Sequence, residues 1–184
     1  MNIFITYFVH GTTTDNEKGL ATGWFHGELS ELGKRQAKEL GELTSHIKFD
    51  VFFCSDLKRA VDSAKLGFGH KYKIIQDERL RECNYGDSNE KPEEEFKKNV
   101  EEKYINTPYK SGESYTDVEK RVKDFLNYLK KDYNGKRVAI VSHQAPQLAF
   151  EVLINKNTWK EAIDQDWRKS KKWQPGWEYE LKDI

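Results

Sequence analysis

The chain has 184 residues, and its 31 basic side chains equal its 31 acidic side chains, so the formal net charge is zero. A chain of this length buries enough apolar surface for a core, and we expect residues 1–184 to fold as a single domain. Zero net charge excludes a whole-molecule field that would attract nucleic acid or an anionic membrane. We therefore expect no nucleic-acid or membrane partner, and any anion site must be local.

Cysteine usage favours a reducing compartment. Cys54 and Cys83 are the only two cysteines, too few for a disulfide scaffold and without the spacing of zinc ligands. The first residues show no basic segment followed by a long apolar stretch, and no run of about 18 apolar residues occurs anywhere. We therefore expect a cytoplasmic protein without a metal or other cofactor. The sequence makes no prediction of its oligomeric state.

The first half of the chain alternates strand and helix patterns. Residues 3–9 are β-branched and aromatic on both faces, which predicts a central strand ending at His10. Residues 50–55 and 71–75 are two further short strand candidates. A helix is expected after Ser30, which would cap it, and another over 57–68. The apolar faces of these two helices are predicted to contain Leu32, Gln36, Leu40 and Leu43 in the first, and Leu57, Ala60, Val61, Ala64 and Leu66 in the second.

The second half begins with a polar stretch, residues 87–111, which fits either a solvated helix or a mobile insertion. Ser114 and Asp117 form a capping-box pattern that opens a helical repeat continuing to Leu129. A strand over 136–142 is expected to end at His143. The final part contains a helix with Pro146 in its first turn, an edge strand over 177–181, and four tryptophans: Trp159, Trp167, Trp173 and Trp177.

This alternation predicts an α/β fold, a three-layer sandwich in which a mostly parallel central sheet has helices on both faces. In such sheets ligands bind beyond the carboxyl ends of the strands. His10, Arg59 and His143 lie at or just after three of these ends. Two imidazoles and a guanidinium beside helix N-termini suit a dianion, and phosphate is the first expectation.

The neutral imidazole of His10 is also a competent nucleophile near pH 7. The backbone around Gly11, or the hydroxyls of Thr12 to Thr14, would then fix its tautomer. A departing alkoxide needs a proton donor, and Glu82, between the apolar Leu80 and Cys83, is the carboxyl best placed to be desolvated. Three other carboxyls compete for this role: Asp77, Glu78 and Asp87.

Six ordered segments resemble motifs of the histidine phosphatase superfamily, whose fold is phosphoglycerate mutase-like. They are "VHGTTTDN", "GWFHGELSELGKRQA", "CSDLKRAVDSA", "RLRECNYGD", "GESYTDVEKRV" and "VAIVSHQAP". The resemblance implies a metal-independent hydrolase of small phosphomonoesters that works through a phosphohistidine. It implies that His10 is the nucleophile, Glu82 the acid and then the base, and His143 a further catalytic group. The substrate-binding residues it implies are Arg59, Gly11, Asn16, Thr22, Gly23 and Gln144.

The sequence departs from the family pattern at Val9, where the family has an arginine. Three explanations are open: a basic residue such as Lys18 or Arg81 fills the gap, the substrate carries less charge there, or the chain binds phosphoesters without turnover. Two enzyme alternatives also remain. One is a phosphoglycerate-type mutase, disfavoured because the segment after Cys83 is short for enclosing a bisphosphate. The other is a metal site made of His10, His143 and Glu82.

The part of the substrate beyond the phosphate is expected to contact Phe25, His26, the 87–111 segment and the tryptophan-rich end of the chain. None of these has a unique chemical preference, so the sequence predicts the phosphate and not the identity of the substrate.

Overall fold

A computed structural model describes residues 1–96, 103–170 and 176–182. In this part of the chain five strands form one sheet in the order β3-β2-β4-β1-β5. The strands are β1 (Ile3–Val9), β2 (Val51–Cys54), β3 (Ile74–Gln76), β4 (Arg137–Ser142) and β5 (Trp177–Leu181). The first four are parallel, whereas β5 runs antiparallel to β1 along one edge. The carboxyl ends of β1 and β4 are therefore neighbours.

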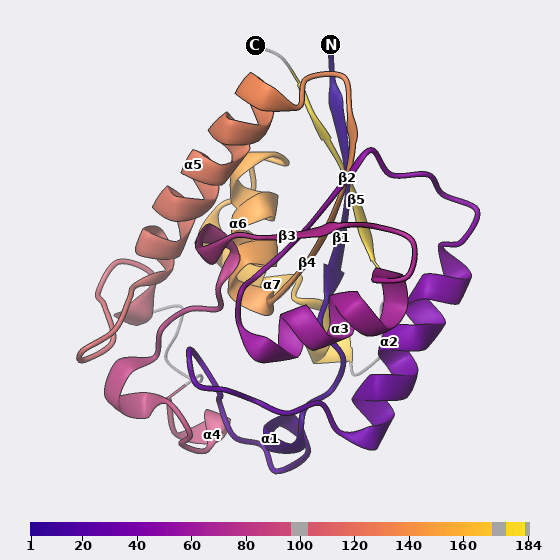
Figure 1. Ribbon diagram of the computed structural model, residues 1–184. Helices are drawn as coiled ribbons and strands as arrows, with labels where there is room; N and C mark the ends of the chain where they lie inside the picture. Colours follow the sequence, from indigo (N-terminus) through magenta and orange to yellow (C-terminus); the bar gives the residue numbers. More distant parts are fainter. Residues whose placement is uncertain (97–102, 171–175, 183–184) are drawn as a thin grey trace.

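Helices cover both faces of the sheet (Figure 1). One layer contains α2 (Glu31–Leu43) and α3 (Lys58–Phe68), and the other contains α5 (Tyr115–Asp132), α6 (Gln144–Leu153) and α7 (Trp159–Asp164). Two short helices, α1 (Thr14–Glu17) and α4 (Glu93–Phe96), lie beyond the carboxyl ends of the strands, at the bottom of Figure 1. The predicted three-layer α/β fold is confirmed.

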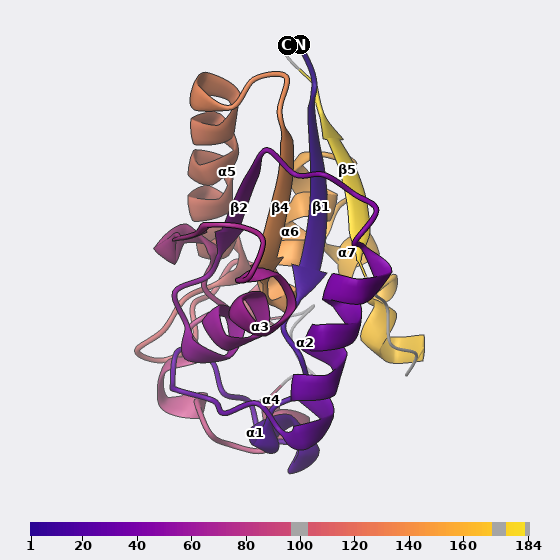
Figure 2. The same cartoon turned by 45° about the vertical axis from the view of Figure 1, so that its right-hand side comes forward.

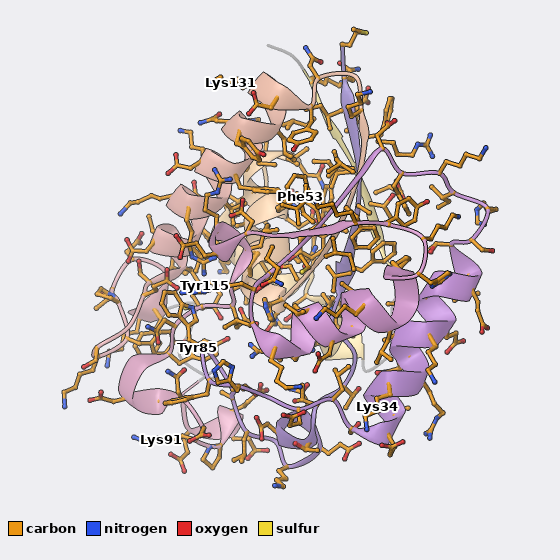
Figure 3. The ribbon with its side chains drawn as sticks, in the orientation of Figure 1. Lys34, Phe53, Tyr85, Lys91, Tyr115 and Lys131 are labelled. Atoms are coloured by element: carbon orange, nitrogen blue, oxygen red, sulfur yellow. The ribbon has the colours of Figure 1, made fainter. Side chains whose placement is uncertain are left out.

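The sheet separates two apolar cores. Phe53 of β2 faces the α5 and α6 side, where it contacts Phe125 at a ring-centroid distance of 5.3 Å, and Figure 3 shows it deep inside the molecule. On the other side Phe52 packs against Phe68 of α3 at 4.6 Å. Burying one such side chain contributes about 1.5–3 kcal/mol. Both faces of the central strands are therefore fixed by packing, and with them the positions at which the strands end.

The predicted apolar face of α2 is partly wrong. Leu32 and Leu43 are 43% and 49% exposed, and the buried residues are Gly33, Ala37 and Leu40. The physical reason is the close approach of two helix backbones: a Cβ at Gly41 would overlap the main chain of Gly67 in α3. Small residues, rather than leucines, therefore define the contact face. The prediction for α3 fails in the same way at Leu66, which is 38% exposed.

Most other predicted elements are found. Ser30 caps α2 by accepting a hydrogen bond from the backbone N–H of Gly33, and Ser114 and Asp117 form the capping box of α5. The polar 87–111 stretch contributes 3₁₀ turn η2 (Gly86–Ser88) and α4, and residues 97–102 within it lie outside the described residues. Trp173 also lies outside them. No described helix is long and apolar enough to cross a membrane.

Candidate active site

His10 follows the last residue of β1, and its ring is held by the next peptide. Its Nδ1 donates a hydrogen bond to the carbonyl oxygen of Gly11 at 2.7 Å, because a carbonyl can only accept. Nε2 therefore carries the lone pair, and it accepts a hydrogen bond from Nε of Arg59 at 3.3 Å. Burial, reinforced by the charge of Arg59, lowers the pKa of His10 well below its ordinary value. The imidazole is neutral at physiological pH, as a nucleophile must be.

Gly11 supports the site from behind. Its N–H donates to Oγ of Ser63 in α3 at 3.0 Å, and a Cβ there would overlap the backbone of Gly33 in α2. The backbone carbonyl of Gly11 thus orients His10, one of the two alternatives raised by the sequence. Gly11 is not among the residues that border the pocket. The need for a glycine at this position is therefore explained by the close packing of α2 and not by the approach of a substrate.

Arg59 lies in the first turn of α3 and is only 2% exposed. Its guanidinium donates to the main-chain carbonyl of Gly23 at 2.7 Å and to that of Phe25 at 3.1 Å. Burial lowers its pKa to about 10, which leaves the group charged at neutral pH. Gly23 adopts φ +53°, where a Cβ would run into the side chain of Asn89. The loop around Gly23 is therefore shaped to place two carbonyls against Arg59.

His143 follows β4, the neighbour of β1, and its ring lies 5.0 Å from that of His10 between centroids. Its backbone carbonyl accepts a hydrogen bond from the Tyr7 hydroxyl at 2.8 Å. Within the described part of the chain, both ring nitrogens are buried without a hydrogen-bond partner. Burial and the adjacent Arg59 lower the pKa of His143 well below its ordinary value. Two neutral imidazoles and one buried cation thus converge at one point.

Glu82 is 5% exposed, and its carboxylate accepts hydrogen bonds from the backbone N–H of Cys83 at 2.9 Å and of Ala145 at 3.0 Å. The second donor belongs to the first turn of α6, so the carboxyl group of Glu82 is held at the N-terminus of that helix.

The three competing carboxyls lie elsewhere. Asp77 accepts hydrogen bonds from Arg79, and Asp87 pairs with Lys110 at 3.0 Å. The side chain of Glu78 is 76% exposed. Of these four carboxyls, Glu82 alone borders the pocket that contains His10.

The pocket brings together most of the residues that the sequence indicates. It is bordered by His10, Asn16, Ala21, Thr22, Gly23, Arg59, Glu82, Tyr85, Glu93 and Arg168. In Figure 3, Tyr85 lies among the loops near α4, far from Lys131 at the opposite end. Gln144 is buried but is not a bordering residue, because its side chain amide is bonded to Asp166 and Arg168. Arg168 is itself a pocket residue, so Gln144 contacts the border of the pocket through it.

Four residues that border the pocket are not singled out by the sequence: Ala21, Tyr85, Glu93 and Arg168. Of these, Glu93 lies within the 87–111 segment that is expected to contact the substrate. Arg168 belongs to 3₁₀ turn η5 (Trp167–Ser170), within a run of basic residues that carries no pattern distinguishing it. The two basic residues considered as replacements for the arginine at position 9 are not in the pocket. Arg81 pairs with Asp56 at 2.8 Å, and Lys18 is exposed at the end of α1.

The described residues contain no group of three histidine, cysteine or acidic side chains arranged to hold a metal ion. His10, His143 and Glu82 share a region without forming such a group. Cys54 and Cys83 are both buried, and neither forms a disulfide in the part of the chain that the structure describes. The pocket contains two guanidinium groups, of Arg59 and Arg168, and two carboxyl groups, of Glu82 and Glu93. Guanidinium groups bind anions such as phosphate.

Comparison with known proteins gives a family match and several relatives. The family model "histidine phosphatase superfamily (branch 1)" matches residues 7–178. Phosphoserine phosphatase 1 of Hydrogenobacter thermophilus is 32% identical over 150 residues, 77% of this chain and 71% of that protein. Fructose-2,6-bisphosphatase TIGAR of Xenopus tropicalis is 36% identical over 134 residues, 68% of this chain and 49% of its own length. The chain thus spans about half of that relative.

A mycobacterial glucosyl-3-phosphoglycerate phosphatase, solved with VO3, superposes with a TM-score of 0.78 and 25% identity, covering 88% of this chain and 86% of that one. Bacterial 2,3-bisphosphoglycerate-dependent phosphoglycerate mutases are also among the relatives. The chain belongs to the histidine phosphatase superfamily. The family and fold expected from its motifs are both confirmed.

Proposed function

We propose that this chain is a phosphomonoester hydrolase that acts on a small phosphorylated metabolite through a phosphohistidine at His10, without a metal. The observation that carries the proposal is the orientation of His10. Its Nδ1 is bonded to Gly11, and its unprotonated Nε2 lies beside Arg59 in a pocket that also contains Glu82. A neutral nucleophile, an anion-binding cation and a buried acid are the groups that this reaction requires.

In the first step, Nε2 of His10 attacks the phosphorus and the P–O bond to the alcohol breaks. Arg59 and His143 donate hydrogen bonds to the phosphoryl oxygens, where negative charge is concentrated. Protonated Glu82 gives its proton to the leaving alkoxide, so the products are an alcohol and phosphohistidine. The negative charge of the phosphate stabilises the N–H forms of the buried His143 ring nitrogens. These nitrogens have no hydrogen-bond partner in the described part of the chain.

In the second step, the carboxylate of Glu82 takes a proton from water, and the resulting hydroxide attacks the phosphohistidine. The P–N bond breaks, inorganic phosphate leaves, and Glu82 is protonated again for the next cycle. The two backbone N–H groups that hold Glu82 keep its carboxyl in place for both transfers. The two steps together return the site to its starting protonation, so no other proton donor is needed.

A second hollow is lined by sequence neighbours of pocket residues and suits the organic part of the substrate. It measures about 280 Å³ and is lined by Trp24, Phe25, Asn84, Gly86, Asn89 and Ser111. Gly23 and Tyr85, which border the phosphate pocket, are the chain neighbours of this lining. Phe25, as expected from the sequence, belongs to it, whereas His26 is exposed and does not. Its aromatic side chains and amide groups suit a leaving group that has both apolar and polar parts.

A mutase is the alternative that the relatives favour, since phosphoglycerate mutases are among them. The two functions differ in the fate of the phosphohistidine: a hydrolase transfers its phosphoryl group to water, and a mutase transfers it to a second hydroxyl. Incubation with a phosphoglycerate distinguishes them, because a hydrolase releases stoichiometric inorganic phosphate and a mutase produces the isomer.

The proposal is tested by hydrolysis of an aryl phosphate between mildly acid and neutral pH, with EDTA present. We expect turnover by the wild type and a loss of at least about 10³-fold in His10→Ala. The exposed His46 provides the matched control, and His46→Ala should retain full activity. Equal activity of His10→Ala and the wild type would refute the nucleophile, and inhibition by EDTA would refute metal independence. An inactive wild type that still binds inorganic phosphate would indicate a phosphoester-binding module.

A further inference from the structure

Val9 ends β1 immediately before the nucleophile, and its side chain offers no donor to a phosphate. It is half-buried and packs against the large apolar core, with Ser142 of β4 opposite in the strand register. The hydrocarbon thus belongs to the interior of the protein. A second guanidinium for the phosphate would therefore have to come from another part of the chain.

Arg168 provides a guanidinium from a distant segment. It borders the same pocket as His10 and Arg59, although it follows His10 by more than 150 residues in the sequence. Its Nη1 donates to Oε1 of Gln144 at 2.5 Å. A guanidinium has five N–H donors, and this bond uses one. The guanidinium is planar and permanently charged, and it lies at the edge of the pocket.

Gln144 and Asp166 orient Arg168 from behind. The side chain of Gln144 donates to Asp166, and the backbone N–H of Arg168 donates to the same carboxylate at 3.0 Å. Gln144 follows His143 directly and begins α6. The hydrogen bonds Asp166–Gln144–Arg168 therefore connect the tail segment to the strand end that carries His143.

An aromatic contact fixes the same segment to β1. Trp167 packs on Trp177 with 5.8 Å between ring centroids, and Trp177 pairs with Tyr7 across the β5–β1 ladder. The rings of Tyr7 and Trp177 are 6.4 Å apart. Two partly buried tail tryptophans thus hold the η5 turn beside the strand bearing His10.

We propose that Arg168 is the second phosphate-binding guanidinium of this site and replaces, from the C-terminal segment, the arginine that the family pattern has at position 9. This inference rests on the proposed function. Arg168 binds a non-bridging oxygen of the phosphoryl group, and its contact strengthens as charge develops on that oxygen. Gln144 is a positioning residue, because it acts on the phosphate only through Arg168.

The charges around Arg168 fit this role. Although burial opposes the charge, nearby carboxylates, Glu93 foremost, raise the pKa of Arg168 above its ordinary value. Glu93 borders the pocket as well, so Arg168 has a counter-charge within the site. The charge of Arg168 also contributes to lowering the pKa of both His10 and His143. Arg168 is therefore electrostatically part of the site.

The test compares Arg168→Ala with Lys169→Ala, its exposed neighbour. Loss of one preorganised donor lowers kcat/KM by about 10²–10³-fold, and we expect this for Arg168→Ala and no more than about 2-fold for Lys169→Ala. Arg168→Lys should retain part of the activity, because it keeps the charge without the fork of donors. Added guanidinium ion should restore turnover in Arg168→Ala. Adding Val9→Arg to the same variant should raise its kcat/KM by at least about tenfold. A merely structural role would give neither rescue.

Two further outcomes separate this proposal from the proposed function. If Arg168→Ala keeps its activity and its affinity for inorganic phosphate while His10→Ala is inactive, Arg168 is not a phosphate ligand and the hydrolase stands. If the wild type shows no turnover, the hydrolase fails, and phosphate affinity alone tests Arg168. In that case a drop of at least about tenfold in Arg168→Ala supports the assignment, and unchanged affinity overturns it. Thermal melting of each variant verifies folding.

Discussion

The pocket has two walls that differ in how the chain builds them. The strand-end wall consists of His10, which follows β1, and Arg59, which begins α3, and behind them His143, which follows β4 and lies against the ring of His10 without bordering the pocket. The loop wall consists of Tyr85, Glu93 and Arg168, which come from short turns around η2, α4 and η5. Figure 2 shows the strand ends converging above α1 and α4. The first wall is fixed by the sheet, and the second by individual side-chain contacts.

This difference teaches how such a site can vary. A residue at a strand end cannot move without shifting the ladder of hydrogen bonds and the core behind it. A turn can present a new side chain with little disturbance, because it runs over the surface. The replacement of an arginine at position 9 by Arg168 follows this division: the lost donor belongs to a strand, and the proposed new one to a turn.

The largest expected effect concerns Glu82, which is held between the two walls by the start of α6. Glu82→Gln keeps the volume and removes the proton, so kcat should fall by about 10²–10⁴-fold for an alkyl phosphate, whose alkoxide needs protonation. An aryl phosphate has a better leaving group and should lose much less in the first step. Steady-state and burst kinetics on both substrates measure the difference.

The exposed Glu78, in the same segment, provides the control, and Glu78→Gln should behave as the wild type. Equal losses on alkyl and aryl phosphates in the burst phase would show that Glu82 positions the substrate rather than protonating it. In that case Glu82 would belong with the binding groups of the strand-end wall.

A smaller effect tests how far the strand-end wall depends on helix packing. Gly67→Ala adds one methyl group where α3 meets the backbone of Ala37 in α2, and overpacking of this kind costs about 1–3 kcal/mol of unfolding free energy. Leu66→Ala removes three carbons from a 38% exposed side chain and should change stability by no more than about 0.5 kcal/mol. Urea denaturation compares the two variants. A larger loss of unfolding free energy in Leu66→Ala than in Gly67→Ala would support the apolar face of α3 that the sequence predicts.

The sequence predicts the strand-end wall and not the loop wall, for a physical reason. His10 and His143 end two buried apolar runs, and parallel strands bring their carboxyl ends to one edge of the sheet. Arg59 follows from the same rule, through the helix after the second run. Arg168 lies in a turn whose position depends on Gln144, Asp166 and two tryptophans, none of which forms a periodic pattern.

The helix faces show a related limit. Hydropathy correctly predicts that α2 and α3 exist, yet it assigns Leu32, Leu43 and Leu66 to the interior. Periodicity weighs side chains by their hydrophobicity, whereas this contact depends on the absence of side chains at Gly41 and Gly67. Only the relative placement of the two helices reveals that close approach.

The smallest effect is a pH dependence of stability that belongs to the strand-end wall. Burial, then Arg59, lowers the pKa of His10 and His143 in the folded state. Above the ordinary histidine pKa of about 6.5 both states are neutral, and below it the unfolded chain binds protons that the folded chain does not. The unfolding free energy should therefore fall with decreasing pH, by up to about 1.4 kcal/mol per pH unit for each imidazole. In phosphate-free urea titrations between pH 7.5 and 5.5, His143→Gln should show a shallower decline than the wild type, since carboxylates common to both proteins cancel in the difference. Parallel declines would mean that the His143 ring accepts its proton in the folded state, and the strand-end wall would then be as adaptable to charge as the loop wall.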